Sequence, residues 1–133
     1  MYTECKSQNR SPSWDEIRMN MCVELSRRST CWKKKTAAII VHQNRVISEG
    51  YNGTPKGEKH CVDVGPRDRA EHRSWSKENE VHAEMNALVL SNSRGGIPAG
   101  SVMYTVLSPC KDCAEEVLRA GISRVVFKEV YRQ

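Results

Sequence analysis

Residues 101–121 have the sequence SVMYTVLSPCKDCAEEVLRAG, and this stretch decides the fold. Its first part, Ser101–Val106, is rich in β-branched and aromatic residues and predicts a strand, which the turn Leu107–Pro109 ends. Cys110–Ala120 predicts a helix, and a further strand is expected over 123–130. A strand, a helix and a strand in this order favour an α/β fold, in which helices flank a sheet.

The N-terminal half adds one helix and a hairpin to this pattern. Ser11-Pro12-Ser13 predicts a helix start, and the helix is expected to run to about Arg28. Its apolar residues at three- and four-residue steps, which we expect to face the core, are Trp14, Ile17, Met21 and Leu25. Ala37–Val41 and Val46–Ser48 predict two strands joined by a polar turn. Residues 1–10 are polar and are expected to be flexible.

A long loop separates this hairpin from the next helix. The loop opens at Gly50, extends to about Asn79 and is rich in Gly, Pro, Asp, Arg and His. Loops of this length are uncommon in compact domains unless they are functional or are tied down, for example by a metal. Val81–Leu90 then predicts a helix whose core-facing residues are Met85, Leu88 and Val89. The length of 133 residues is in the range of one domain, which we expect to span the whole chain.

The composition suits an anionic ligand but does not identify it. The chain has 21 basic and 16 acidic residues, a net charge of +5 and a pI near 9.0. The basic residues are dispersed apart from Lys33–Lys35, so we expect no nucleic-acid partner. No apolar run could span a bilayer and no signal peptide is apparent, which favours a cytoplasmic protein without a membrane partner (the host cytoplasm if the source is viral). Six cysteines in such a protein indicate metal ligands or buried thiols rather than disulfides.

Two short motifs carry the chemistry: His82-Ala83-Glu84 and Pro109-Cys110-Lys111-Asp112-Cys113. Each lies at the predicted start of a helix. The Cys-x-x-Cys step brings both sulfurs to one side of a first helical turn, where the helix dipole favours thiolate. His82 can supply a third ligand to the same zinc ion, and three protein ligands leave a position for water, as in a catalytic site. A Cys-x-x-Cys motif by itself would also suit a redox pair or a structural zinc site.

Glu84 lies two residues beyond the predicted histidine ligand, where its carboxylate can point at the metal-bound water without binding the metal. Zinc lowers the pKa of water toward about 7, and Glu84 can take that proton, pass it to a ring nitrogen and then protonate the departing amine. The combination of His-x-Glu with Pro-Cys-x-x-Cys is the signature of zinc-dependent nucleobase deaminases. We therefore expect Zn²⁺ to be held by His82, Cys110 and Cys113, with Glu84 as the catalytic residue.

From about Met19 to Tyr131 the sequence resembles the cytidine and deoxycytidylate deaminase superfamily, and within it the bacteriophage type of deoxycytidylate deaminase. The motifs that carry the resemblance are Gly50–Pro55, His60–Asp63, Asn79–Ala87, Leu107–Cys110 and Val130-Tyr131. Members that act on free cytidine typically have Cys where His82 stands, which argues against that substrate. The resemblance implies a three-layer α/β sandwich with a mixed five-stranded sheet flanked by helices.

The resemblance also implies a substrate, dCMP, and the residues that bind it. Asn52 is expected to hydrogen-bond the sugar 3′-hydroxyl, the Ala83 N–H to hold the base carbonyl, and the Ser108 carbonyl to receive the leaving amine. Tyr131 matches a tyrosine near the family's phosphate site. The basic residues expected to assist at the phosphate are Lys35 and Arg28. In the alternative interpretation Asn52 only satisfies a turn, since Asn tolerates the left-handed conformation, and Tyr131 is a surface or interface aromatic.

Some bacteriophage relatives carry a structural zinc besides the catalytic one. By resemblance to them, the ligands of a second zinc would be Cys31, Cys61, His72 and Glu80. Such a metal would order the long loop, which has few apolar anchors. The alternative is two buried thiols and a solvated histidine. Cys5 and Cys22 have no assigned partner, and we expect core or surface thiols there.

Family members are commonly homo-oligomers, usually hexamers, that dCTP with Mg²⁺ activates and dTTP inhibits. The residues that resemble their effector-binding segment are Gly50, Tyr51, Asn52, Gly53 and Lys56. The expected reaction converts dCMP and water to dUMP and ammonia, which supplies thymidylate synthesis. Two alternatives stay open: a zinc deaminase of another base, such as tRNA adenosine or cytidine, and an inactive zinc-stabilised binding module. Intact Glu84 argues against the module, because a structural zinc site needs no unliganded carboxylate.

Overall fold

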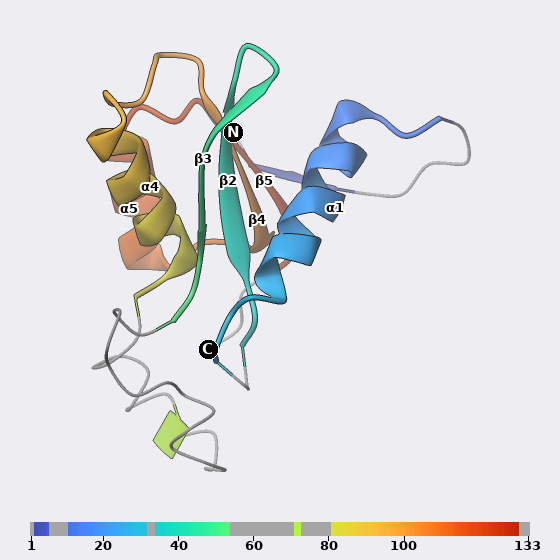
Figure 1. Ribbon diagram of the computed structural model, residues 1–133, viewed down its shortest axis with the longest axis vertical. Coiled ribbons are helices and arrows are strands. Elements are labelled where there is room, and N and C mark those ends of the chain that lie inside the picture. The colour runs from blue at the N-terminus through green and yellow to red at the C-terminus, as the bar shows by residue number, and fades with distance from the viewer. Residues whose placement is uncertain (1, 6–10, 32–33, 54–70, 73–80, 131–133) are drawn as a thin grey trace.

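The computed structural model describes residues 2–5, 11–31, 34–53, 71–72 and 81–130, which form three layers (Figure 1). The central layer is a five-stranded sheet in the order β1-β5-β4-β2-β3. Its strands are β1 (Tyr2–Glu4), β2 (Ala37–His42), β3 (Arg45–Tyr51), β4 (Val102–Leu107) and β5 (Arg124–Glu129). The helices are α1 (Trp14–Ser26) on one face of the sheet and α4 (Ala83–Ser93) and α5 (Lys111–Arg119) on the other. The expected α/β fold with a mixed five-stranded sheet is confirmed.

Strand β2 sets the direction of its neighbours, because it pairs antiparallel with both β3 and β4. β3 and β4 therefore run the same way, and their C-terminal ends lie at the same end of the sheet. β4 pairs parallel with β5, and α5 makes the connection between them. In the described part of the chain no helix is long and apolar enough to cross a membrane.

The fifth strand comes from a segment that we expected to be flexible. Tyr2–Glu4 pairs parallel with β5, and the Cys5 N–H donates to the Phe127 carbonyl at 2.9 Å. The Tyr2 ring packs edge-on against that of Phe127, with the ring centroids 6.5 Å apart. Pairing here covers an edge of β5 that would otherwise present unpaired backbone groups. The structure thus differs from the expectation for residues 2–5, whereas residues 6–10 lie outside the described part.

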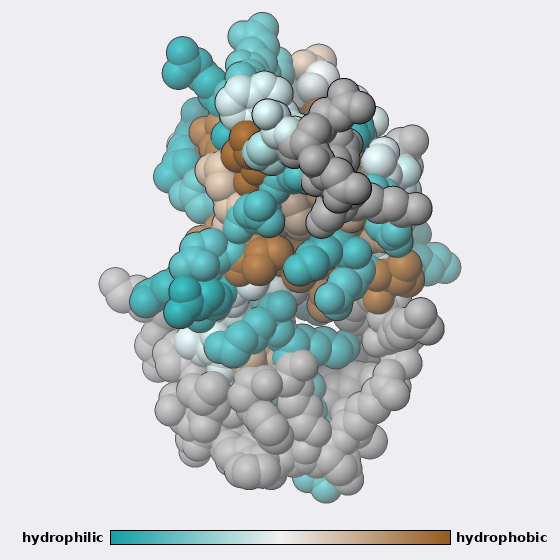
Figure 2. All heavy atoms as spheres, turned by 90° about the vertical axis from the view of Figure 1, so that its right-hand side faces the viewer, coloured by the Kyte–Doolittle hydropathy of each residue, from teal (hydrophilic) through white to brown (hydrophobic). Residues whose placement is uncertain are grey.

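Helix α1 begins where the sequence predicts, because the Ser13 hydroxyl accepts the Glu16 N–H at 3.1 Å. The residues that it buries are Met19, Cys22 and Ser26. The predicted core stripe is wrong at two positions, since Trp14 is 57% exposed and Met21 is 41% exposed. Figure 2, viewed toward α1, shows brown apolar patches between hydrophilic residues on this face. Arg18 lies over the Trp14 ring, 5.0 Å from its centroid, so a cation covers the ring in place of the core.

Polar contacts with the sheet explain why α1 has this rotation. Arg18 donates to the Asn44 carbonyl in the β2–β3 turn at 2.8 Å. Asp15 accepts hydrogen bonds from Tyr104 on β4 at 2.7 Å and from Arg124 on β5 at 2.6 Å. If α1 were rotated to bury the predicted apolar residues, Arg18 and Asp15 could not make these contacts. The hydrogen bonds of these two residues therefore decide which face of α1 is buried.

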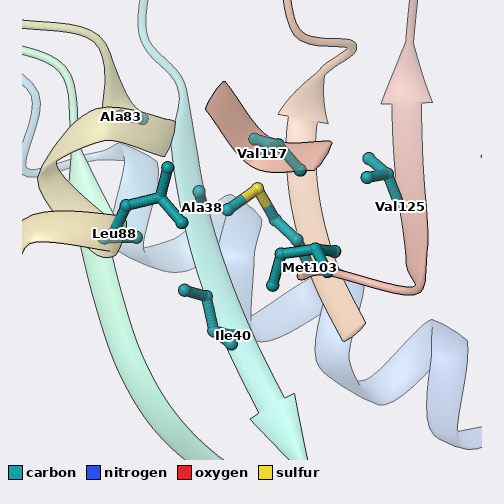
Figure 3. Packing of buried hydrophobic residues seen from close by; sticks show 9 residues of the cluster. Ala38, Ile40, Ala83, Leu88, Met103, Val117 and Val125 are labelled. Atoms are coloured by element: carbon teal, nitrogen blue, oxygen red, sulfur yellow. The ribbon is translucent and has the colours of Figure 1, made fainter. Parts of the chain in front are cut away.

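Two apolar clusters lie on opposite faces of the sheet. On the α4 and α5 side, Ala38, Ile40 and Met103 of the strands meet Leu88 and Val117 of the helices (Figure 3). Alternate residues of β2 point to the other side and pack against α1. Helix α4 is part of the first of these clusters, so the packed core fixes its position on the sheet.

Helix α4 corrects one further expectation. Val89 was predicted to face the core but is 61% exposed. The buried residues of α4 are Ala83, Glu84, Ala87, Leu88 and Ser91. These buried residues recur at steps of three and four, but one of them is the acidic Glu84. A search for apolar residues alone therefore does not find this face.

Candidate active site

Two helix N-termini lie at the end of the sheet where β3 and β4 finish. β4 ends at Leu107, and Cys110 is the N-cap of α5. After β3, Gly53 forms an isolated bridge with Val81, in which the two residues exchange backbone hydrogen bonds of 3.2 and 2.8 Å. The chain then turns directly into α4, with His82 as its N-cap. The two predicted motifs thus meet in space although 28 residues separate His82 from Cys110.

His82, Cys110 and Cys113 form a cluster whose ligand atoms all lie within 4.8 Å of one another. The Nδ1 atom of His82 is 3.2 Å from the Cys113 sulfur and 3.6 Å from the Cys110 sulfur. A tetrahedral zinc with bonds of about 2.3 Å to sulfur and about 2.0 Å to nitrogen would hold such atoms about 3.5–3.8 Å apart. The residues therefore fit one zinc ion with His82 Nδ1 as the nitrogen ligand.

The local structure explains how the two sulfurs come together. Cys110 is in extended conformation at the N-cap and its sulfur makes no capping hydrogen bond, so it stays free to face the cluster. Cys113 follows in the first turn and is buried. Burial raises the pKa of the Cys113 thiol, and the negative charges of Glu84 and Cys110 raise it further. A metal bound here must therefore displace a proton from Cys113.

Glu84 is the most deeply placed acidic group of the site, with only 4% of its surface exposed. It lies in the first turn of α4, and its carboxyl group interacts electrostatically with Cys113 and His82. Burial raises the pKa of Glu84, while the interactions with Cys113 and with the charge of His82 partly oppose this shift. A carboxyl with a raised pKa takes up a proton more readily than an exposed one, which suits proton transfer.

Close contacts between β3 and α4 fix the position of Glu84. A Cβ atom at Gly50 would lie 2.6 Å from the Ala87 nitrogen and 2.7 Å from the Ala83 carbonyl oxygen, so only glycine fits. The Ser48 hydroxyl donates to the Ala87 carbonyl at 2.6 Å. Gly50, which we had assigned only to an effector site, thus also has a packing role.

Asn86 adds a further link between the same two elements. Its Nδ2 donates to the Tyr51 carbonyl at 2.9 Å, at the end of β3. Sequence reasoning did not single out Asn86 or Ser48. The signal that could have identified them is a short polar side chain in a position that the element pattern buries or half-buries.

Asn52 is buried at the end of β3, and its side chain is held on both sides. The Oδ1 atom accepts the Thr36 N–H at 3.0 Å, and Nδ2 donates to the Lys34 carbonyl at 2.6 Å. Its own carbonyl accepts the Ser29 hydroxyl at 2.9 Å. The amide therefore does satisfy backbone groups, but Asn52 is not in the left-handed conformation that the turn interpretation assumed. The oxygen and the nitrogen of the amide can each make a second hydrogen bond, so the Asn52 side chain can still bind a ligand.

Two residues predicted to bind the substrate through their backbone, Ala83 and Ser108, lie within two positions of His82 and Cys110 along the chain. Ala83 is the first residue of α4, so its N–H has no acceptor within the helix. The Ser108 N–H donates to the Glu129 carbonyl at 2.8 Å, which fixes the turn that leads to Cys110.

The predicted basic residues lie near the C-terminal end of α1. Lys35 Nζ donates at 3.0 Å to the carbonyl of Ser29, the residue whose hydroxyl donates to the Asn52 carbonyl. Arg28 is exposed two residues after the end of α1. Two further predicted positions, Tyr131 and Lys56, lie outside the described residues.

A second pair of ligand-type residues comes together away from the first cluster. The Cys31 sulfur is 3.1 Å from Nε2 of His72, and both residues are buried. The alternative of a solvated histidine is therefore wrong. Cys61 and Glu80, the other two expected ligands, lie outside the described residues. Cys22 is a core thiol whose sulfur donates to the Ala37 carbonyl at 3.1 Å.

Residues 12–129 match the family model of the cytidine and deoxycytidylate deaminase zinc-binding region. A deoxycytidylate deaminase of Enterobacteria phage T2 is 36% identical over 141 residues, which cover 80% of this chain and 75% of that protein. The deoxycytidylate deaminase of Homo sapiens is 36% identical over 127 residues, which cover 92% of this chain and 68% of that protein. The solved structure of dCMP deaminase from cyanophage S-TIM5 in complex with dCMP and dUMP has a TM-score of 0.76 and 29% identity, and covers 93% of this chain and 87% of that chain.

Proposed function

This chain belongs to the cytidine and deoxycytidylate deaminase family, and on that premise we propose that it is a zinc-dependent enzyme that converts dCMP and water to dUMP and ammonia. One observation carries the chemistry: a buried carboxyl, Glu84, interacts electrostatically with a cluster of one imidazole and two thiols that fits zinc. The substrate is supported by relatives at 36% identity that are deoxycytidylate deaminases, and by the cyanophage enzyme solved with dCMP and dUMP.

His82 Nδ1 and the sulfurs of Cys110 and Cys113 would hold the metal. When bound there, zinc supplies a Lewis acid that makes water acidic enough to be deprotonated near neutral pH. Glu84 takes a proton from the water that attacks C4 of the base and delivers it to N3. It then carries the second proton of that water to the amino group, which leaves as ammonia. A buried carboxyl with a raised pKa is suited to hold each proton in turn.

We assign the substrate contacts to groups around this cluster. The Ala83 N–H would donate to the base carbonyl, and the Ser108 carbonyl would accept from the leaving amine. Asn52 would bind the sugar 3′-hydroxyl through the second hydrogen of Nδ2 or the second lone pair of Oδ1. The residues proposed to lie near the phosphate are Tyr131, Lys35 and Arg28.

A second, structural zinc is also part of the proposal. Its ligands would be Cys31, Cys61, His72 and Glu80. The support is the 3.1 Å separation of the Cys31 sulfur and His72 Nε2, in a place from which solvent is excluded. A thiol and an imidazole at this distance could share one metal ion.

We further propose that the enzyme is a hexamer regulated by dCTP with Mg²⁺ as activator and by dTTP as inhibitor. The effector segment would comprise Gly50–Gly53 and Lys56. Support comes from the contacts of β3 with α4, because a ligand that moves Tyr51 would also move Asn86 and the helix that carries Glu84. Production of dUMP by such an enzyme would supply thymidylate synthesis.

The test measures ammonia release from dCMP, deoxycytidine and dCTP, each with and without dCTP–Mg²⁺ or dTTP as effector. We expect turnover of dCMP, and a loss of about a thousandfold or more in Glu84→Gln with zinc still bound. Glu115→Gln, an exposed glutamate of α5, is the matched control and should keep full activity. A zinc-loaded protein that releases no ammonia from any of the three would refute the proposal. Activity on tRNA in that case would identify a deaminase of another base.

A further inference from the structure

The ends of strands β2, β3 and β4 are joined through Thr36, the residue before β2. Thr36 is only 8% exposed. Its backbone N–H donates to Asn52 Oδ1 at 3.0 Å, and its carbonyl accepts the Asn52 N–H at 3.4 Å. Its side-chain Oγ1 accepts the Leu107 N–H at 3.2 Å. One residue therefore connects the segment that carries Asn52 to the turn that leads from β4 into α5.

The β2–β4 ladder stops just short of this point. Its last pair on this side is Ala38 with Thr105, and the same register continued by two residues would place Thr36 opposite Leu107. The backbone groups of Thr36 are engaged with Asn52, so the side-chain hydroxyl is the group that reaches Leu107. In effect, a hydroxyl replaces a ladder carbonyl where the strands diverge.

The Leu107 peptide is held on its other side as well. The Thr105 hydroxyl donates to the Leu107 carbonyl, and the next N–H in the chain, that of Ser108, donates to the Glu129 carbonyl of β5. Of these bonds only the one from Thr36 ties the turn to the β3 side of the site, where Asn52 lies. Loss of that bond would free the turn to move relative to Asn52.

We propose that the Thr36 hydroxyl is a positioning group, which sets the Leu107–Pro109 turn, and with it the Ser108 carbonyl and Cys110, relative to Asn52. The inference rests on the proposed function, in which the Ser108 carbonyl receives the leaving amine and Cys110 is a zinc ligand. Thr36 itself touches neither the substrate nor the metal in this scheme. Its effect on the reaction is transmitted through the turn.

The geometry predicts how a variant should divide its effect between kcat and KM. Thr36→Val removes the hydroxyl at nearly constant shape but keeps the backbone N–H that binds Asn52. The sugar contact is therefore retained, whereas the carbonyl that receives the amine loses its anchor. We expect kcat for dCMP to fall about tenfold, because displacements of a fraction of an ångström at a reacting group have effects of this order, and KM to stay within about twofold.

The experiment compares three variants with the wild type. Thr36→Val is the test, Thr36→Ser retains the hydroxyl and should recover kcat to within about twofold, and Ser101→Ala is the control. Ser101 is also buried and its hydroxyl donates to the Pro98 carbonyl at 2.6 Å, but it lies before the opposite end of β4. Amide hydrogen exchange of Leu107 is measured in each protein, together with zinc content. Protection of this amide should fall about tenfold or more in Thr36→Val and be retained in Thr36→Ser and Ser101→Ala.

The results test the positioning role of Thr36 separately from the proposed function. Wild-type kcat in Thr36→Val, a loss in Thr36→Ser as large as in Thr36→Val, or unchanged Leu107 exchange would overturn the positioning role. An inactive wild type would overturn the proposed function, while the exchange data would still report whether the hydroxyl holds the turn. If Thr36→Val does not fold, Thr36→Ala takes its place against Thr36→Ser, with the same readouts.

Discussion

Replacing Gly50 by alanine should displace helix α4 and reduce the activity of a protein that still folds. The new Cβ would lie 2.6 Å from the Ala87 nitrogen and 2.7 Å from the Ala83 carbonyl, both of which are backbone atoms that no rotamer change can move. An ordinary contact of about 3.5 Å requires β3 and α4 to separate by about 0.9 Å. Glu84 and His82 move with α4, and a shift of about 1 Å at a catalytic group is associated with about a hundredfold loss of rate.

The cost to the free energy of unfolding has two opposing contributions. Overpacking of this kind costs about 1–3 kcal/mol, and alanine returns about 0.4–1 kcal/mol by restricting the unfolded chain. We therefore expect Gly50→Ala to lose about 0–2.6 kcal/mol in urea unfolding while kcat for dCMP falls about a hundredfold. Gly53→Ala provides a graded comparison, because its Cβ meets only the Thr30 hydroxyl at 3.1 Å, which a side chain can relieve. Wild-type kcat in a folded Gly50→Ala protein would refute the argument that this close approach positions Glu84.

Three further predictions concern the metals and the anchor of α1. Burial raises the pKa of Cys113, so protons compete with zinc for its sulfur. Zinc affinity should therefore weaken as the pH falls, by about tenfold per pH unit for each proton that zinc binding releases. Chelator competition at several pH values measures this affinity, and an affinity that does not change with pH would contradict the prediction. Zinc analysis should give two ions per chain in the wild type and one in Cys31→Ser with dCMP turnover retained; one ion in both proteins would eliminate the second site. The Arg124 guanidinium lowers the pKa of Asp15, so this pair contributes stability above the unfolded pKa of about 3.9 that is lost as the pH falls through the lower folded value. In urea unfolding, Arg124→Ala should therefore cost about 0.5–1 kcal/mol at neutral pH. The cost should be smaller at a pH below both the folded and the unfolded pKa of Asp15. An equal cost at the two pH values would rule out the ion pair as its cause.

The parts of the fold with a strong local pattern could be predicted from the sequence. The predicted helix Cys110–Ala120 is α5 (Lys111–Arg119), and the predicted strand Ser101–Val106 is β4 (Val102–Leu107). Strand β1 could not be predicted, because three residues carry no period and their pairing depends on a distant edge of β5. The rotation of α1 could not be predicted either, because it depends on how Asp15 meets Arg124, 109 residues away along the chain.

For the site, sequence motifs predicted which residues lie together but not what holds them. His82 and the two cysteines were identified from residue type and spacing, and they lie within one ligand cluster. Thr36, Ser48 and Asn86 were missed because their roles are contacts between segments, which no spacing rule encodes.

The two proposed metal sites differ in how much of the fold depends on them. The ligand atoms of the His82 cluster lie within 4.8 Å of one another, and each ligand sits on or next to a helix start fixed by the packed core. Zinc binding there needs little ordering of the chain, so its free energy is available for the reaction rather than for folding. The pair of Cys31 and His72 instead links the chain after α1 to a residue of the segment between β3 and α4, whose sequence has few apolar residues. Removing this second metal should therefore loosen that segment while the His82 cluster keeps its zinc.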